Sequence, residues 1–221
     1  MDVFEVLRGQ RDAENAFHMA KYMRNQFEFL GIQAKPRRLL TKPFFQDERQ
    51  RLKAGGQLDW AFVEACWQAP EREFQNVATD YLARFKVCLL PEDLKHLEQL
   101  VVTKSWWDSV DALVKTIGYL VHQFPTLKQE MLRWSLSGNL WLRRAAIIHQ
   151  LGMKTATDQS LLSQCICNNF GSQEFFINKA IGWALRDYAK ADADWVILFM
   201  EQHQERFAVL SWREANKHLN S

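Results

Sequence analysis

The feature that most constrains the fold of this chain is a helical pattern that recurs every 33–35 residues. Four aromatic residues occupy the same place in successive units, in steps of 33, 34 and 35 residues: Phe74, Trp107, Trp141 and Phe176. A further step of 35 residues leads to Ser211. Each unit has room for two helices and a turn, and this period is typical of an α-solenoid. The pattern therefore predicts an all-α protein built from stacked helical repeats.

Within each unit the apolar residues follow helical spacing. The clearest stripe comprises Phe74, Val77, Ala78, Tyr81, Leu82 and Phe85. Similar stripes run from Val110 to Val121, from Ala145 to Leu151 and from Ala180 to Ala184. This spacing places the apolar side chains on one face of a helix. No stretch alternates apolar and polar residues between turn signals, so no sheet is expected.

Length and composition set further bounds. A chain of 221 residues is long enough for one large domain, and we expect a single repeat domain over residues 1–221. The net charge of +2 means that a nucleic-acid function would depend on local basic clusters. The four cysteines contain no CxxC pair, which favours reduced, buried thiols. The sequence also predicts neither a signal peptide nor a membrane span, and hence a cytoplasmic protein that is a monomer.

Asp111 breaks the repeat pattern. Four residues after the opening aromatic, the other units carry a small residue: Ala78, Ala145 and Ala180. A small residue there lets neighbouring helices approach, whereas an unpaired carboxylate would be costly to bury. Asp111 must therefore either find a partner inside the stack or open onto a cleft.

The segment around Asp111 allows more than one interpretation. Trp107 and Asp111 lie one helical turn apart and share a face, which favours a functional pair. Ser105 could instead cap the helix, with Asp108 three residues later as its capping-box partner. Trp106 and Asp108 are otherwise expected to be a core aromatic and a helix-start charge.

Arg144 is the candidate partner of Asp111. It lies beside the corresponding face of the next unit, and stacked helices lie roughly 10 Å apart. Its guanidinium could pair with Asp111 as a structural salt bridge, or it could bind a phosphate. The sequence leaves both alternatives open.

Two local basic clusters add to this surface. Lys179, Trp183 and Arg186 share one helical stripe, an arrangement suited to a groove that binds a phosphate backbone. The first unit carries Lys35, Arg37 and Arg38 near Tyr22. Together these clusters could line one concave face.

Motifs for other chemistry do not occur. The sequence has no GxxxxGK[ST], GxGxxG or GxSxG motif, and its six histidines show no HExxH spacing. We expect neither a metal nor a cofactor.

Five runs, in order along the chain, give a closer identification: AKYMRNQFEFLGIQ, PEREFQNVATDYL, VTKSWWDSVD, NLWLRRAAI and EFFINKAIGWALRDYAK. They resemble the AlkD-like DNA alkylation-repair glycosylases over nearly the whole chain. The resemblance implies a curved stack of HEAT-like repeats with duplex DNA on its concave face. It also implies removal of purines alkylated at N3 or N7, without metal or cofactor.

The resemblance also implies roles for individual residues. Asp111 would face the glycosidic bond, with Trp107 and Trp183 as aromatic walls against the sugar and backbone. Arg144 would contact a phosphate, and Tyr22 would close the cleft from the N-terminal side. The chain departs from the family at residues 34–36, an expected loop where Ala-Lys-Pro replaces the Thr-Pro of many relatives.

The sequence thus predicts a monofunctional alkylpurine DNA glycosylase of base excision repair, acting on duplex DNA. Its proposed DNA contacts are Tyr22, Lys35, Arg38, Arg144, Lys179 and Arg186. The alternative is a non-catalytic α-solenoid that binds DNA structure or a protein partner. Retention of Asp111 together with both tryptophans favours the enzyme.

Overall fold

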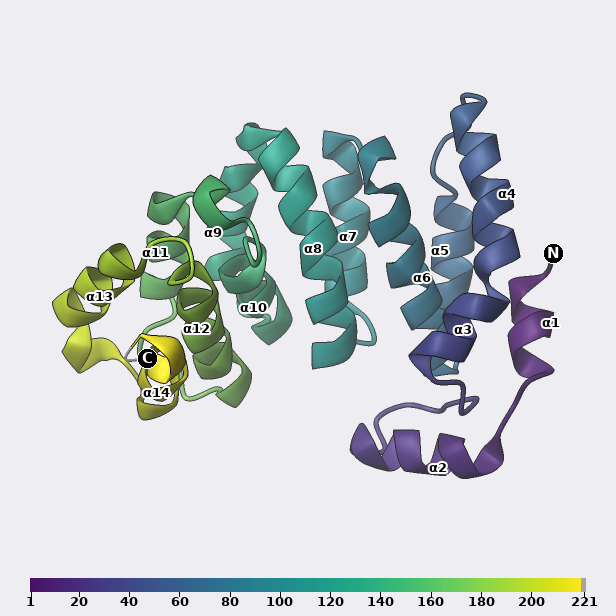
Figure 1. The fold of residues 1–221 in the computed structure, drawn as a ribbon, viewed down its shortest axis with the longest axis horizontal. Coiled ribbons are helices and arrows are strands. Elements are labelled where there is room, and N and C mark those ends of the chain that lie inside the picture. The colour runs from purple at the N-terminus through teal and green to yellow at the C-terminus, as the bar shows by residue number, and fades with distance from the viewer. Residues whose placement is uncertain (220–221) are drawn as a thin grey trace. The chain divides into compact units, whose positions relative to one another are not determined.

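A computed structural model describes residues 1–219 of the chain, with the side chain of residue 218 left out (Figure 1). Within this part there are fourteen α-helices and no strand, apart from one isolated bridge between Glu28 and Glu71. The all-α fold of helical repeats is therefore confirmed. Backbone contacts divide the chain into two compact units, residues 1–89 and 90–221. The single domain over residues 1–221 remains a prediction.

The first unit contains six α-helices and a short 3-10 turn. They are α1 (Val3–Arg8), α2 (Ala13–Tyr22), α3 (Ala34–Leu40), α4 (Lys42–Lys53), α5 (Trp60–Gln68), α6 (Arg72–Phe85) and η1 (Lys86–Cys88). Helices α4, α5 and α6 run side by side (Figure 1). Between them, the rings of Phe45, Tyr81 and Phe85 lie 5.0–6.3 Å apart, centroid to centroid. This aromatic cluster forms much of the core of the unit.

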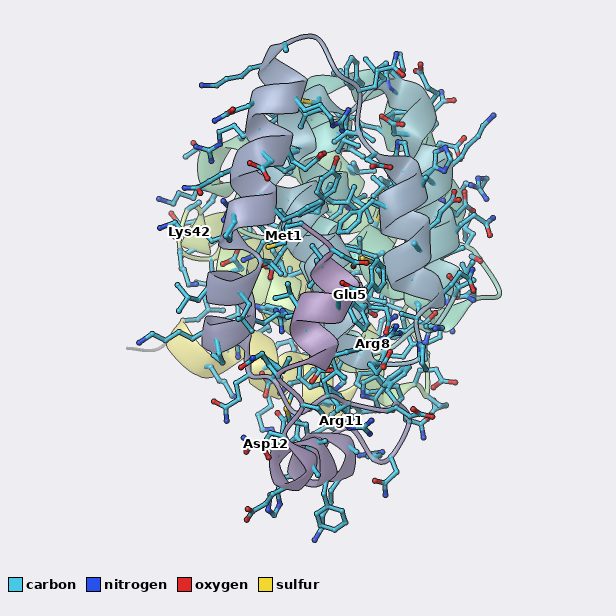
Figure 2. The ribbon with its side chains drawn as sticks, turned by 90° about the vertical axis from the view of Figure 1, so that its right-hand side faces the viewer. Met1, Glu5, Arg8, Arg11, Asp12 and Lys42 are labelled. Carbon is cyan, nitrogen blue, oxygen red and sulfur yellow. The ribbon has the colours of Figure 1, made fainter. Side chains whose placement is uncertain are left out.

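Helix α2 is attached to this unit differently, because none of its ten residues is buried. Figure 2 views the end of the unit where α2 begins, just after Asp12. Its connection to α3 is held by Glu73, whose buried carboxylate accepts the backbone N–H groups of Leu30, Gly31 and Ile32 at 2.8–3.0 Å. Gly31 has a φ of +94°, and a Cβ there would lie 2.0 Å from the carbonyl oxygen of Asp12. Glu73 and Gly31 together fix the loop beside α2.

The second unit contains eight α-helices joined by short 3-10 turns. They are η2 (Pro91–Asp93), α7 (Leu94–Val102), α8 (Trp107–Gln123), η3 (Pro125–Leu127), α9 (Lys128–Ser135), α10 (Leu140–Ile148), η4 (Lys154–Ala156), α11 (Gln159–Cys167), α12 (Phe175–Tyr188), α13 (Ala193–Gln202), η5 (Gln204–Arg206), α14 (Val209–Ala215) and η6 (Asn216–His218). Helices α8, α10, α12 and α14 are the repeat helices of this unit.

The structure confirms the helical repeat. Each of the four opening aromatics lies within the first three residues of α6, α8, α10 or α12, and Ser211 lies in α14. Several hydrogen bonds of the second unit join residues 33–35 positions apart: Arg144 to Asp111, Ser211 to Asn178, Arg133 to Glu98, Asn168 to Ser135 and Gly152 to Asp187. Such bonds link equivalent places in neighbouring repeats, so the sequence period is also the stacking period.

The apolar stripes form the core as expected. Every member of the stripes in α6 and α8 is buried, as are the alanines at positions 78, 145 and 180. One detail was wrong: α10 ends at Ile148, so Leu151 lies in the following turn and not on the helix. At this turn the carbonyl of His149 lies close to Gly118 on α8, where a Cβ would lie 1.9 Å from the oxygen.

The cysteines are all free thiols. Cys66 and Cys165 are buried, as predicted, whereas Cys88 and Cys167 are half-buried. Burial raises the pKa of the Cys165 thiol to about 12, which keeps it protonated. Among the described helices, none is long and apolar enough to cross a membrane.

Candidate functional site

Asp111 is a largely buried carboxylate on α8 with a defined partner. Its side chain is 17% exposed. Both carboxylate oxygens accept hydrogen bonds from Arg144 at 2.8 Å, one from Nε and one from Nη2. Burial raises the pKa of Asp111, and the paired guanidinium opposes that rise. A bidentate, charge-assisted pair of this kind favours the ionised form of the carboxylate and fixes its orientation.

Arg144 connects three helices. It extends from α10 to Asp111 on α8, and its Nη1 donates to the backbone carbonyl of Phe176 on α12 at 2.7 Å. The guanidinium carbon lies 5.7 Å from the ring centroid of Phe176 and 5.9 Å from that of Trp183. The cation therefore also contacts the aromatic faces that flank the site.

This geometry shows the first of the two alternatives for Arg144, the salt bridge with Asp111. The residue is only 3% exposed, and its donors are directed to Asp111 and to the Phe176 carbonyl. The salt bridge between Arg144 and Asp111 is therefore present, and a phosphate contact of Arg144 remains a prediction. In this arrangement Arg144 fixes the orientation of the Asp111 carboxylate and neutralises its negative charge.

Aromatic side chains surround the Asp111–Arg144 pair. Trp107 lies one turn before Asp111 on α8, and Trp183 lies on α12 beside Arg144; both are half-buried. Behind them, Trp106, Trp141 and Phe176 form a triad with ring centroids 5.0–5.8 Å apart. The site is thus a largely buried carboxylate held by an arginine, with aromatic rings from successive repeats beside the pair.

The start of α8 does not have the capping box that Ser105 and Asp108 could have formed. Ser105 does not cap the helix, because its hydroxyl donates to the carbonyl of Val101 at 2.7 Å. The capping residue is Trp106, which has no side-chain capping bond. Asp108 lies in the first turn of α8, where its negative charge interacts favourably with the helix dipole.

The basic stripe of α12 converges on one acidic residue. Glu214 on α14 is 2% exposed, and it pairs with Lys179 at 2.8 Å, Arg186 at 2.7 Å and Lys217 at 2.7 Å. Gly182 permits this contact, since a Cβ there would lie 2.4 Å from the Cβ of Glu214. Three cations on one carboxylate leave a net positive charge beside Trp183. Glu214 therefore fixes the positions of the two cations of the stripe.

The ion cluster around Glu214 should make the stability of the protein sensitive to acid. Burial acts to raise the pKa of Glu214, but hydrogen bonds from Lys179 and Lys217 outweigh it and lower the pKa from 4.5 to about 2. A lowered folded-state pKa stabilises the protein above the unfolded pKa, and this contribution disappears as the pH falls toward the folded value. We expect urea denaturation of the wild type to show a loss of about 3 kcal/mol between pH ~4.5 and ~2 from this group.

Glu214→Gln should remove most of that part of the pH dependence. Glu201→Gln provides a matched control, because Glu201 is an exposed residue of α13. An unchanged acid profile in Glu214→Gln would contradict the assignment.

The predicted contacts in the first unit are on its surface. Tyr22 is 73% exposed at the end of α2. Arg38 shares Asp80 with Arg37, at 3.1 and 3.2 Å, and remains largely exposed. Lys35 is exposed in the first turn of α3, so residues 34–36 begin a helix and do not form the expected loop. The roles of Tyr22, Lys35 and Arg38 in DNA binding remain predictions.

Sequence reasoning missed two members of the site. Phe176 was noted only as a repeat opener, yet it supplies both a carbonyl and a ring to Arg144. Glu214 was not singled out. The repeat contained a signal for it, because Arg144, Lys179 and Glu214 occupy the same position, three residues after the start of successive units. Residues at this position contact the neighbouring repeat.

The fold and this site define an all-α repeat protein with an arginine-held carboxylate between aromatic walls. A family model described as "DNA alkylation repair enzyme" matches residues 3–219. Among solved structures, a predicted DNA alkylation repair enzyme from Enterococcus faecalis is similar, with 35% sequence identity and a TM-score of 0.85. The similarity covers 95% of this chain and 97% of that one. A comparison with curated protein sequences gave no match. The chain belongs to the DNA alkylation repair enzyme family.

Proposed function

We propose that this protein is a monofunctional DNA glycosylase. It hydrolyses the N-glycosidic bond of cationic N3- and N7-alkylated purines in duplex DNA, the first step of base excision repair. The observation that carries this proposal is the Asp111 carboxylate, which is nearly buried, fixed by Arg144 and flanked by tryptophans.

The chemistry follows from the charge of the substrate. A purine alkylated at N3 or N7 is cationic, so it leaves with the electrons of the C1′–N bond and needs no proton. The deoxyribose then develops oxocarbenium character, which a preorganised carboxylate stabilises. A water molecule attacks C1′ and loses a proton, and the unshared lone pairs of Asp111 can orient it. Arg144 is unsuited to act as a general acid because a guanidinium keeps its proton.

The test is release of free base from defined duplexes. A duplex with one N7-methylguanine or 3-methyladenine should yield the free base by mass spectrometry, and the strand should stay intact until alkali cleaves the abasic site. Duplexes with the neutral lesions hypoxanthine or uracil should be left unchanged, because without a proton donor those bases would have to leave as anions. Efficient release of a neutral base would overturn the mechanism. No release from any alkylated duplex would favour a non-catalytic DNA-binding protein.

The basic stripe of α12 should make DNA binding strongly dependent on salt. Lys179 and Arg186 each use one donor on Glu214 and have others available for a phosphate. Each contact that is lost should reduce the slope of log K against log[salt] by about 0.9. We expect this reduction in Lys179→Ala and in Arg186→Ala, measured by fluorescence anisotropy on a duplex.

Lys190→Ala is the matched control for the salt experiment, because Lys190 follows α12 and is exposed beside Asp187. Its slope should equal that of the wild type. Unchanged slopes in both stripe variants would show that the DNA does not contact this stripe.

A further inference from the structure

A pocket lies in the first unit, where the C-terminal ends of α4 and α6 meet η1. Its volume is about 390 Å³. The lining residues are Arg49, Leu52, Lys53, Arg84, Phe85, Val87 and Cys88. No acidic residue lines it. We propose that this pocket, which we call the basic pocket, binds a short acidic peptide segment of a partner protein.

The charged residues of the basic pocket are available to a ligand. Arg49 and Lys53 lie one turn apart on α4, are exposed, and have no carboxylate partner within the described residues. Arg84, from α6, lies over the ring of Phe45, with its guanidinium carbon 4.9 Å from the centroid. By contrast, Arg51 on the same helix is paired with Glu48 at 2.8 Å. Cations near the C-terminal end of a helix interact favourably with the helix dipole. That interaction does not account for the apolar surface that lies between these cations.

The apolar residues decide the kind of ligand. Val87 is 70% exposed at the rim, and the largely covered Leu52 and Phe85 form the floor. An inorganic anion would leave this floor in contact with water. A peptide with alternating acidic and large apolar side chains would cover it, while its carboxylates pair with the three cations. Charge complementarity and the apolar floor therefore favour an acidic, amphipathic peptide over a phosphodiester backbone.

The experiment uses the full chain and a fluorescein-labelled peptide with the sequence Asp-Asp-Phe-Asp-Leu-Asp. Two peptides serve as controls, one with Asn in place of each Asp and one with Ala in place of Phe and Leu. Fluorescence polarisation should show saturable binding of the first peptide, with each control bound at least about ten-fold more weakly. Equal binding of the Asn peptide, or no binding of the acidic peptide, would overturn the proposal.

Two further measurements locate the peptide. Arg49→Ala/Lys53→Ala should weaken binding roughly ten-fold, whereas Lys42→Ala/Lys95→Ala removes two exposed cations elsewhere and should change it less than about two-fold. In a Cys167→Ser background, saturating peptide should slow alkylation of Cys88 by iodoacetamide several-fold. Base release by the Arg49→Ala/Lys53→Ala variant should match the wild type.

Three outcomes of these measurements would contradict the proposal. The first is an equal loss of peptide binding in the two double variants. The second is alkylation of Cys88 at the same rate with and without peptide. The third is displacement of the peptide by a short DNA duplex whose binding depends on Arg49 and Lys53. The last result would make the basic pocket a DNA contact. Failure of the proposed glycosylase activity would leave peptide binding unaffected, so the two proposals can be distinguished.

Discussion

Asp111→Asn should reduce the rate of base release from an N7-methylguanine duplex by roughly 10²-fold or more. The substitution keeps the shape of the side chain but removes the charge that stabilises the developing sugar cation. The measurement is single-turnover release of free base, with enzyme in excess, so that weaker DNA binding does not enter the rate. Near wild-type excision would move the chemistry to another residue.

The same substitution has a structural cost that the sequence did not indicate. Asn is nearly isosteric with Asp, so the sequence alone would predict that the fold tolerates the change. The structure shows that Arg144 would then remain as a buried cation without its counter-ion. Breaking one side of such a pair costs about 3 kcal/mol. The activity assay should therefore be run well below the melting temperature of the variant, which circular dichroism measures.

Asp108→Asn is the matched control for Asp111→Asn. It removes a carboxylate one turn earlier on the same helix, in the first turn of α8. We expect its rate of base release to stay within about three-fold of the wild type, since the variant keeps the Asp111 carboxylate and its pair with Arg144. A loss as large as that of Asp111→Asn would mean that general charge near α8, and not one oriented carboxylate, supports the reaction.

Glu73→Ala should give the largest loss of stability in the first unit. It leaves the backbone N–H groups of Leu30, Gly31 and Ile32 buried without acceptors. Each unsatisfied buried donor costs about 1–3 kcal/mol, so for three donors we expect a loss of at least about 3 kcal/mol in the free energy of unfolding. Urea denaturation followed by circular dichroism measures this loss.

Glu14→Ala provides the comparison for Glu73→Ala. Glu14 is an exposed residue of α2, and its removal should change the free energy of unfolding by less than about 0.5 kcal/mol. If Glu73→Ala were as mild as this control, the loop before α3 would be held by other contacts.

Much of the fold could be predicted because repeats are local and periodic. A helix that must bury one face shows this in its apolar spacing, and a stack shows it again at the repeat length. The position of the loop that connects α2 to α3 could not be predicted in this way. Its position depends on Glu73 contacting backbone groups about 40 residues earlier in the chain, and backbone donors leave no trace in the side-chain pattern.

The site was predictable in part, for a related reason. Asp111 drew attention because it breaks the alanine pattern, and Arg144 because it lies one period away. Whether Arg144 faced inward or outward depended on a rotation of the side chain that spacing does not determine. The role of Glu214 was hidden because Gly182 permits the close approach, and a missing Cβ is visible only when the neighbouring helix is in place.

The junction that Arg144 makes between α8, α10 and α12 has a consequence for how such a protein can evolve. Arg144 is buried against Asp111, so loss of the carboxylate alone would leave its cation unpaired. A lineage that lost only Asp111 would therefore carry a less stable protein. Descendants that abandon catalysis should therefore replace both residues, or exchange the pair for apolar side chains of similar volume. Positions 111 and 144 should covary across the family, and Asp111 should be rare where Arg144 has been lost.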